Sequence, residues 1–158
     1  MHRKCKVITA NFKIKEHCDA FASLIDEYRR GTTGDGIGHN ENSASRLISG
    51  IKNHPSARVY FAVFNGLIVG CATCFVGFST FQSKKLINIH DLIITKEFRK
   101  RGFAQSLLEH IESKGQVGNY CKITLEVRSD NDDALNLYSK FGFGPGKHLM
   151  YFLTKSLR

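Results

Sequence analysis

The sequence contains no apolar run that approaches the roughly 18 residues needed to cross a membrane. Its N-terminus, MHRKCKVITANFKIK, is basic but has no continuous apolar core, so we do not expect a signal peptide. Internal repeats and low-complexity tracts are also missing. With 158 residues, 42% of them hydrophobic and 23% charged, the chain is expected to form a single cytoplasmic domain, residues 1–158, with no membrane partner.

The cysteines give no sign of a disulfide framework, because the five of them are odd in number and scattered. Cys71 and Cys74 form a C-x-x-C pair, but no second pair accompanies it, so a zinc site is not expected. The pair lies in an apparent strand, where residues three apart point to opposite faces. The cysteines are therefore predicted to be reduced and structural.

The chain is basic, with a formal net charge of +9. A basic surface can attract nucleic acid, anionic lipid or an anionic cofactor. The basic residues are spread along the chain, and neither an aromatic-interleaved basic stripe nor a nucleic-acid motif is present. We therefore expect a generally basic surface and no nucleic-acid partner.

Hydrophobic periodicity and turn residues predict the order βααβββαβαβ. Asn65-Gly66 indicates a two-residue hairpin turn, and Ser43 is the expected N-cap of the second helix. This order predicts an α/β fold with a mixed, mostly antiparallel central sheet and helices on both faces. The expected strands are 4–10, 60–64, 67–78, 86–94, 121–127 and about 148–154, and the expected helices are 16–30, 43–53, 102–114 and 132–141.

Residues 92–104, LIITKEFRKRGFA, carry the strongest functional signal. A short apolar strand leads into a basic turn, and a helical pattern follows Gly102 at once. Unpaired N–H groups at a helix start, together with the helix dipole, favour a phosphate, and glycine allows close backbone approach. The alternative is a solvated basic loop before an ordinary amphipathic helix. The spacing fits neither the three-glycine dinucleotide fingerprint nor a P-loop.

Residues 121–143, CKITLEVRSDNDDALNLYSKFGF, form a second distinctive segment. It begins with apolar residues at a period of two, which is typical of a strand. The SDN triplet that follows supplies N-cap chemistry for a helix, and Gly142 stands where a C-cap glycine belongs.

Together, the two segments resemble the GNAT superfamily of N-acetyltransferases. Arg99-x-x-Gly102-x-Ala104 is similar to the acyl-CoA pyrophosphate loop of that family. Asn131-x-x-Ala134-x-x-Leu137-Tyr138-x-x-x-Gly142-Phe143 is similar to its segment after the splayed strand. The two motifs stand in the right order, about 30 residues apart, and the likeness is close over residues 57–154 and loose over the N-terminal third.

The resemblance implies an acetyl-CoA-dependent N-acetyltransferase of GNAT-type fold, which transfers the acetyl group directly to an amine acceptor. It also implies that two strands splay apart to admit the pantetheine arm. The cofactor-binding residues that it implies are Leu92, Ile93 and Ile94 for pantetheine, Arg99, Lys100, Arg101, Gly102, Phe103 and Ala104 for the pyrophosphate, and Asn131.

The same resemblance implies two catalytic residues. Tyr138 matches the phenol that protonates the departing thiolate in many family members. His90 lies two residues before Leu92, and strand alternation predicts that the two share a face, so His90 is the candidate base. Asp91 is expected to face the other way and to be structural. The alternatives are a packing role for Tyr138 and a cleft-lining role for His90.

Two other classes of function remain. A non-catalytic acyl-CoA-binding sensor or interaction module would keep the cofactor site, but the presence of Tyr138 argues against it. A nucleic-acid-binding domain is disfavoured by the missing motifs. The sequence does not identify the acceptor amine, although loop 31–42 and helix 43–53 are expected to build the acceptor side. GNAT members are often dimers, so the resemblance leaves a homodimer open.

Overall fold

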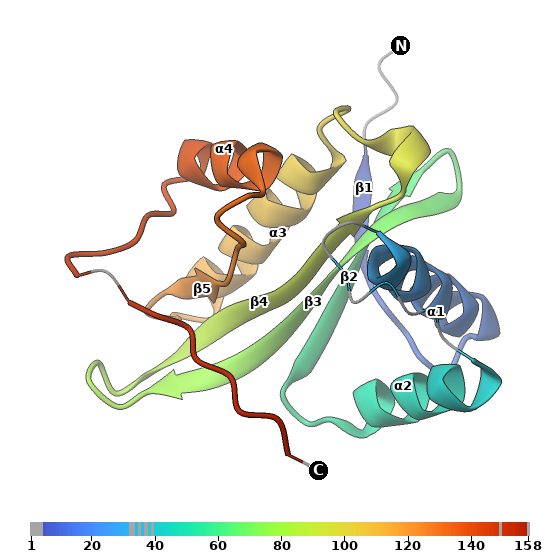
Figure 1. Cartoon of the computed structure of the whole chain (residues 1–158), viewed down its shortest axis with the longest axis horizontal. Coiled ribbons are helices and arrows are strands. Elements are labelled where there is room, and N and C mark those ends of the chain that lie inside the picture. The colour runs from blue at the N-terminus through green and yellow to red at the C-terminus, as the bar shows by residue number, and fades with distance from the viewer. Residues whose placement is uncertain are drawn as a thin grey trace. The chain divides into compact units, whose positions relative to one another are not determined.

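The structure is a computed structural model that describes residues 5–31, 34, 36, 38, 40–148 and 150–157. The chain divides into two compact units, Met1–Leu125 and Glu126–Arg158, which are described separately. Figure 1 labels the elements. The strands are β1 (Lys6–Thr9), β2 (Ala57–Phe64), β3 (Leu67–Ser79), β4 (Lys84–Ile94) and β5 (Ile123–Leu125); the helices are α1 (Lys15–Arg30), α2 (Glu41–Asn53), the 3-10 turn η1 (Lys96–Phe98), α3 (Phe103–Val117) and α4 (Asp132–Lys140).

The first unit contains a five-stranded sheet in the order β1-β2-β3-β4-β5 (Figure 1). Strands β1 to β4 pair antiparallel, and β5 joins β4 in parallel. The predicted turn between β2 and β3 is present, because Asn65 and Gly66 have φ angles of 52° and 82°, as a tight hairpin of this kind requires. The predicted mixed, mostly antiparallel sheet is confirmed.

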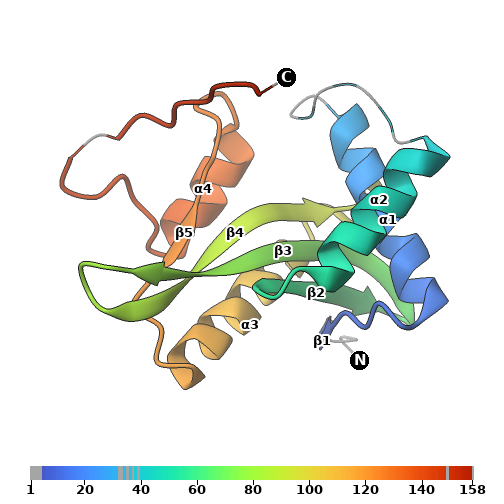
Figure 2. The same ribbon diagram turned by 90° about the horizontal axis from the view of Figure 1, so that it is seen from below.

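Helices cover both faces of this sheet, α1 and α2 on one side and α3 on the other (Figure 2). On the α1 side, Phe21 and Leu24 are buried against Phe61 and other strand residues in one hydrophobic cluster. On the α3 side, Leu107 and Ile111 are fully buried. Burial of apolar area at about 25 cal/mol per Å² makes these two layers the main source of stability.

The predicted last strand, about 148–154, is wrong for the residues that the structure describes. None of residues 148 and 150–154 lies in a strand, and Leu149 is outside the described residues. The segment is apolar, with Met150 and Phe152 83% and 77% exposed, and that pattern alone predicted a strand. A strand also requires a neighbour to complete its hydrogen bonds, and nothing in an apolar pattern supplies one.

Two helix boundaries differ from those predicted by more than one residue. Helix α2 begins at Glu41, because Asn40 is the N-cap and Ser43 completes a capping box with it. Helix α3 continues past Gly115 to Val117 before Gly118 ends it. Residues 32, 33, 35, 37 and 39 of the predicted loop 31–42 lie outside the described residues. Within the described part of the chain, no helix has the length and apolar character that membrane crossing requires.

Candidate active site

Strand β4 carries a bulge that changes which of its residues face each helix layer. Thr73 pairs with Asp91, but the next residue of β3, Cys74, pairs with Ile89. His90 is therefore an extra residue on β4. A bulge shifts the alternation of side chains, so residues before and after it no longer follow one period of two.

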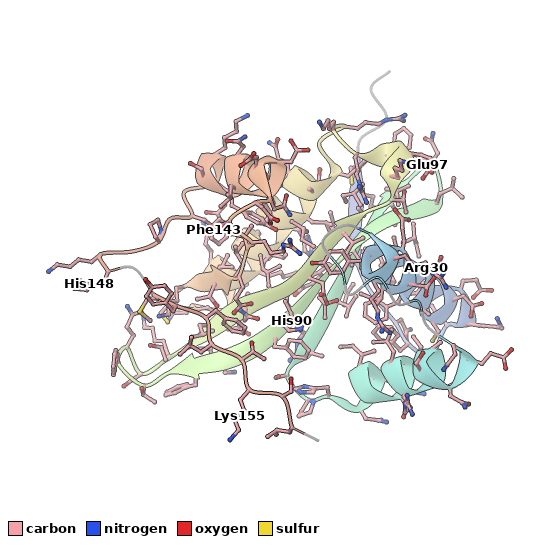
Figure 3. The ribbon with its side chains drawn as sticks, in the orientation of Figure 1. Arg30, His90, Glu97, Phe143, His148 and Lys155 are labelled. Carbon is pink, nitrogen blue, oxygen red and sulfur yellow. The ribbon has the colours of Figure 1, made fainter. Side chains whose placement is uncertain are left out.

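This bulge makes the predicted shared face of His90 and Leu92 wrong. Leu92 pairs with Ala72. Asp91 lies on the same face of the sheet as Ile93, which belongs to the core cluster beneath α1. The His90 ring lies 5.5 Å from the ring of Phe75, measured between centroids. Since Phe75 is two residues from Thr73 on an alternating strand, His90 and Asp91 both lie toward the α1 side. Figure 3 shows His90 near the middle of β4 and Glu97 in the turn beyond its end.

Asp91 is a candidate residue that the alternation argument missed. Its carboxyl is half-buried, and this burial raises its pKa, while the charge of His90 and the hydroxyl of Thr73 oppose the rise. Thr73 is itself only 3% exposed, and its Oγ1 has no hydrogen bond of normal geometry to another described residue. The signal for Asp91 was an acidic residue inside an otherwise apolar strand, beside the candidate base.

The start of α3 offers free hydrogen-bond donors. Gly102 is its N-cap, with φ 84° and ψ 2°, and no side chain caps the helix. The backbone N–H groups of Phe103, Ala104 and Gln105 have no acceptor among the described residues. A Cβ at Gly102 would meet nothing within 4 Å, so the glycine is needed for its left-handed backbone and the space beside it is open. An anion fits such a helix start.

Aromatic packing holds the turn between β4 and α3 in place. Phe64 of β2 lies 5.3 Å from Phe103 and 6.2 Å from Phe98, measured between ring centroids. Arg101 lies over the Phe98 ring, with its guanidinium carbon 5.3 Å from the centroid. Because the Phe103 side chain is 5% exposed, only its backbone is available to a ligand.

Arg99 also shapes this turn from within. Its Nε donates a hydrogen bond of 3.0 Å to the Ile94 carbonyl, and its Nη2 lies 3.5 Å from Glu27 Oε1. The same Glu27 oxygen accepts a 2.9 Å hydrogen bond from the Lys96 N–H. Arg99 thus ties the turn to β4 and α1. Lys100 adopts a left-handed φ of 59°, which is uncommon for a residue with a side chain.

The end of β4 can offer its backbone to a ligand. The side chains of Ile93 and Ile94 are buried, so a pantetheine arm would contact their main chain. The register of β5 with β4 covers only Ile87–Ile89, leaving the later residues of β4 without a β5 partner among the described residues. Gly70 of β3 allows β4 to approach closely here, since a Cβ on it would lie 2.5 Å from the Ile93 carbonyl oxygen.

The remaining predicted site residues belong to the second unit. Asn131 is the N-cap of α4, and its Oδ1 accepts a 3.2 Å hydrogen bond from the Ala134 N–H. Tyr138 lies half-buried on α4, with its ring 5.8 Å from that of Phe143. Gly142 has the left-handed φ of 80° expected after a helix C-terminus. Contact of Asn131 or Tyr138 with a cofactor stays a prediction.

Comparison with known proteins places this architecture in one family. The sequence profile of the "Acetyltransferase (GNAT) family" matches residues 21–143. N-alpha-acetyltransferase 50 of Danio rerio is 32% identical and the probable N-acetyltransferase san of Drosophila melanogaster 29% identical, each over 83 residues and 52% of this chain. These alignments cover 48% and 44% of the two proteins, so the chain spans about half the length of these curated relatives.

Solved structures agree on the fold. The crystal structure of a probable acetyltransferase superposes with a TM-score of 0.82 at 18% identity, covering 97% of this chain and 99% of the other. At this level of identity the match speaks for the fold alone. Taken with the family match over residues 21–143, it leads to one conclusion: the chain belongs to the GNAT family of acetyltransferases.

Proposed function

We propose that the protein is an acetyl-CoA-dependent N-acetyltransferase that moves the acetyl group directly to an amine acceptor. One observation carries this proposal: β4 bears a half-buried carboxyl beside a histidine and then leads into an uncapped helix start. A proton acceptor and an anion-binding turn are thus built on one continuous segment, residues 90–104. Acetyl transfer to an amine requires both functions.

The turn before α3 would hold the pyrophosphate of acetyl-CoA. The free N–H groups of residues 103–105 and the positive end of the helix dipole attract phosphate oxygens. Arg101 and Lys100 add positive charge, while Arg99 holds the turn in shape through Ile94 and Glu27. The edge of β4 that extends beyond its pairing with β5 would orient the pantetheine arm. When bound there, acetyl-CoA supplies the activated thioester.

The pair of His90 and Asp91 would prepare the acceptor. An amine reaches the enzyme as an ammonium ion and must lose a proton before it can attack a thioester. Burial makes the Asp91 carboxylate a stronger base than an exposed aspartate, because its raised pKa favours the protonated form. His90 is exposed and can pass the proton from the acceptor to Asp91 or to water.

Tyr138 would act as the acid that protonates the departing thiolate. This assignment rests on its match to the family motif and on its phenol, which is an effective donor to a thiolate. The properties of Cys71 and Cys74 on β3 agree with direct transfer, in which no acyl-cysteine intermediate forms. Burial raises the pKa of Cys71 strongly and that of Cys74 to about 12, so both are thiols at neutral pH and poor nucleophiles.

Turnover and binding must be measured together to test this proposal. The protein is incubated with acetyl-CoA and a panel of amines, with detection of free CoA thiol, while calorimetry measures acetyl-CoA binding. We expect binding and, with at least one amine, thiol release matched by acetylated product. Binding without turnover across a broad panel would instead favour an acyl-CoA-binding module, and absence of binding would overturn the proposal. The acceptor, a cytoplasmic location and a homodimer remain predictions.

A further inference from the structure

The face of the sheet covered by α3 contains an open cavity of about 270 Å³. Its apolar wall includes Val76 and Ile87, which pair across β3 and β4. Its polar lining includes Arg58 and Tyr60 of β2 and Lys114 of α3, with Tyr120 from the loop after α3. All of these residues belong to the first unit.

This cavity is separate from the proposed active site. Tyr60 pairs with Ala72, which pairs with Leu92, so the cavity lies on the α3 side, whereas Asp91 faces the α1 side. Ile87 is also seven residues before Ile94, where β4 ends. At about 3.3 Å per strand residue, the cavity lies roughly 20 Å along the strand from the phosphate turn.

The polar groups of the cavity are those that would receive an anion. Two of the described lining residues are cations, Arg58 and Lys114, and none is a carboxylate. Nη1 of Arg58 donates to the carbonyls of Pro55 and Ala57 at 3.0 and 2.7 Å, which holds the guanidinium in one orientation. The Lys114 ammonium has no ion-pair partner among the described residues. A carboxylate bound between these two cations would be attracted to both.

The tyrosines supply neutral donors to the same space. Tyr60 is 6% exposed as a whole residue, and its hydroxyl is part of the cavity lining. Burial raises the pKa of Tyr60, so its hydroxyl keeps its proton at neutral pH. The ring of Tyr60 lies 4.9 Å from that of His110 on α3, measured between centroids. This contact restricts the orientation of the Tyr60 ring. The hydroxyl is not among the fully enclosed polar atoms of the described residues, so an acceptor in the cavity can reach it.

We propose that this cavity binds a small organic carboxylate with an apolar body, at a site independent of acetyl transfer. Arg58 and Lys114 would flank the carboxylate, the Tyr60 hydroxyl would donate to it, and Val76 and Ile87 would contact the apolar part. The volume of about 270 Å³ equals that of about nine water molecules at roughly 30 Å³ each. A ligand of the size of benzoate fits within it, since a cavity of about 150 Å³ can hold benzene.

Calorimetric titration of the full chain with sodium benzoate tests this proposal. Benzamide, which has the same shape without the charge, and inorganic phosphate, which has charge without an apolar body, are titrated in parallel. We expect saturable benzoate binding in the millimolar range and at least tenfold weaker binding of the other two. Saturating acetyl-CoA should leave benzoate affinity unchanged. Equal affinity for benzamide, no benzoate binding, or displacement by acetyl-CoA would overturn the proposal.

A matched pair of lysine variants locates the site. Lys114→Met retains an unbranched side chain on an exposed helix position, so the fold should be kept, and benzoate affinity should fall about tenfold. Lys85→Met removes the same charge from an exposed position of β4 outside the cavity and should have no effect. Equal losses in both variants would mean that benzoate responds to net charge alone and would exclude this cavity as its site.

Discussion

Asp91 lies directly opposite Thr73 across the β3–β4 pair, one residue after the bulge at His90. This pairing turns the carboxyl toward the α1 side and places it beside the buried Thr73 hydroxyl, which opposes the rise of its pKa and forms no hydrogen bond of normal geometry with a described residue. Asp91, Thr73 and His90 thus form a polar cluster on the face that also carries the buried Cys71 and Ile93. Such clusters persist in folded proteins when they serve a purpose beyond packing, and here the proposed purpose is proton transfer.

Asp91→Asn should therefore lower kcat by about 10²-fold or more, the usual cost of losing a general base. The rise of kcat/KM with pH should flatten in this variant, and His90→Ala should retain part of it because water can replace the relay. A pH–rate profile with one good acceptor decides the matter, with Asp132→Asn on the exposed start of α4 as control. If His90→Ala abolishes the rise and Asp91→Asn retains it, His90 is itself the base. If both retain it, the rise belongs to the substrate amine.

The same carboxyl predicts how stability varies with pH. Burial raises the pKa of Asp91 in the native state, so the native state binds the proton more tightly than the unfolded chain. The contribution of Asp91 to the stability of the native state is therefore full below about pH 4, where the carboxyl of the unfolded chain is also protonated. This contribution is lost as pH rises through the native pKa. Asp91→Asn resembles the protonated acid at every pH. The variant should melt above the wild type at pH 7 and lose this advantage toward pH 4.

An acid with the opposite shift provides the control for that melting series. A hydrogen bond from Arg128 lowers the pKa of Asp130, whose contribution is present above the unfolded pKa and lost as pH falls. Asp130→Asn should therefore give no advantage at pH 7. An advantage of Asp91→Asn that persists unchanged to low pH would contradict the titration of Asp91 as its cause.

Local sequence signals predicted most of the fold. The Asn65-Gly66 turn and the changes in hydrophobic periodicity from two to 3.6 residues identified all five sheet strands and every α-helix, with small errors at their ends. The remaining errors have one physical origin. A bulge such as that at His90 and a strand such as the one expected at 148–154 depend on the neighbouring strand, which no local pattern contains.

The shape of the turn before α3, the proposed pyrophosphate site, was predictable because its residues lie within a few positions of one another. The left-handed φ of 84° at position 102 favours glycine, and the helical pattern after this residue was visible in the sequence. The role of Arg99 was not visible, because its partner Glu27 is 72 positions away in the sequence and contacts it only after folding. The resemblance assigned Arg99 to the pyrophosphate, which stays a prediction, and it gave no sign of the hydrogen bond from Arg99 to the Ile94 carbonyl.

Gly102→Val should weaken acetyl-CoA binding at least about tenfold, or about 1.4 kcal/mol, by filling the space beside the free N–H groups. A side chain at φ 84° also strains the backbone by about 1–2 kcal/mol. Gly102→Asn separates the two effects, because asparagine tolerates this conformation better than other residues. We expect it to melt closer to the wild type while still binding acetyl-CoA weakly by calorimetry. Wild-type affinity in both folded variants would remove the turn from the cofactor site.

Glu27→Ala tests whether the turn must be held in shape. Glu27 accepts a hydrogen bond from the Lys96 N–H and pairs with Arg99, so its loss should loosen the turn and raise the Kd of acetyl-CoA about threefold to tenfold. If only electrostatics mattered, removing a negative charge near a phosphate site would strengthen acetyl-CoA binding. The direction of the change in affinity therefore separates the two explanations. Asp19→Ala removes an exposed acid from the same helix and serves as control. Tighter binding to the Glu27 variant would exclude the positioning role.

Tyr138→Phe should lower kcat by roughly 10²-fold with little change in acetyl-CoA affinity, because a general acid acts only in the transition state. The variant keeps the ring that lies 5.8 Å from Phe143, so the packing of α4 should survive, and equal melting temperatures would show this. The defect should be smaller with an acyl donor whose thiol leaves readily without a proton, such as an activated aryl thioester. A merely structural tyrosine would slow both donors equally. Wild-type turnover with acetyl-CoA would return Tyr138 to a packing role and leave the thiolate to be protonated by water.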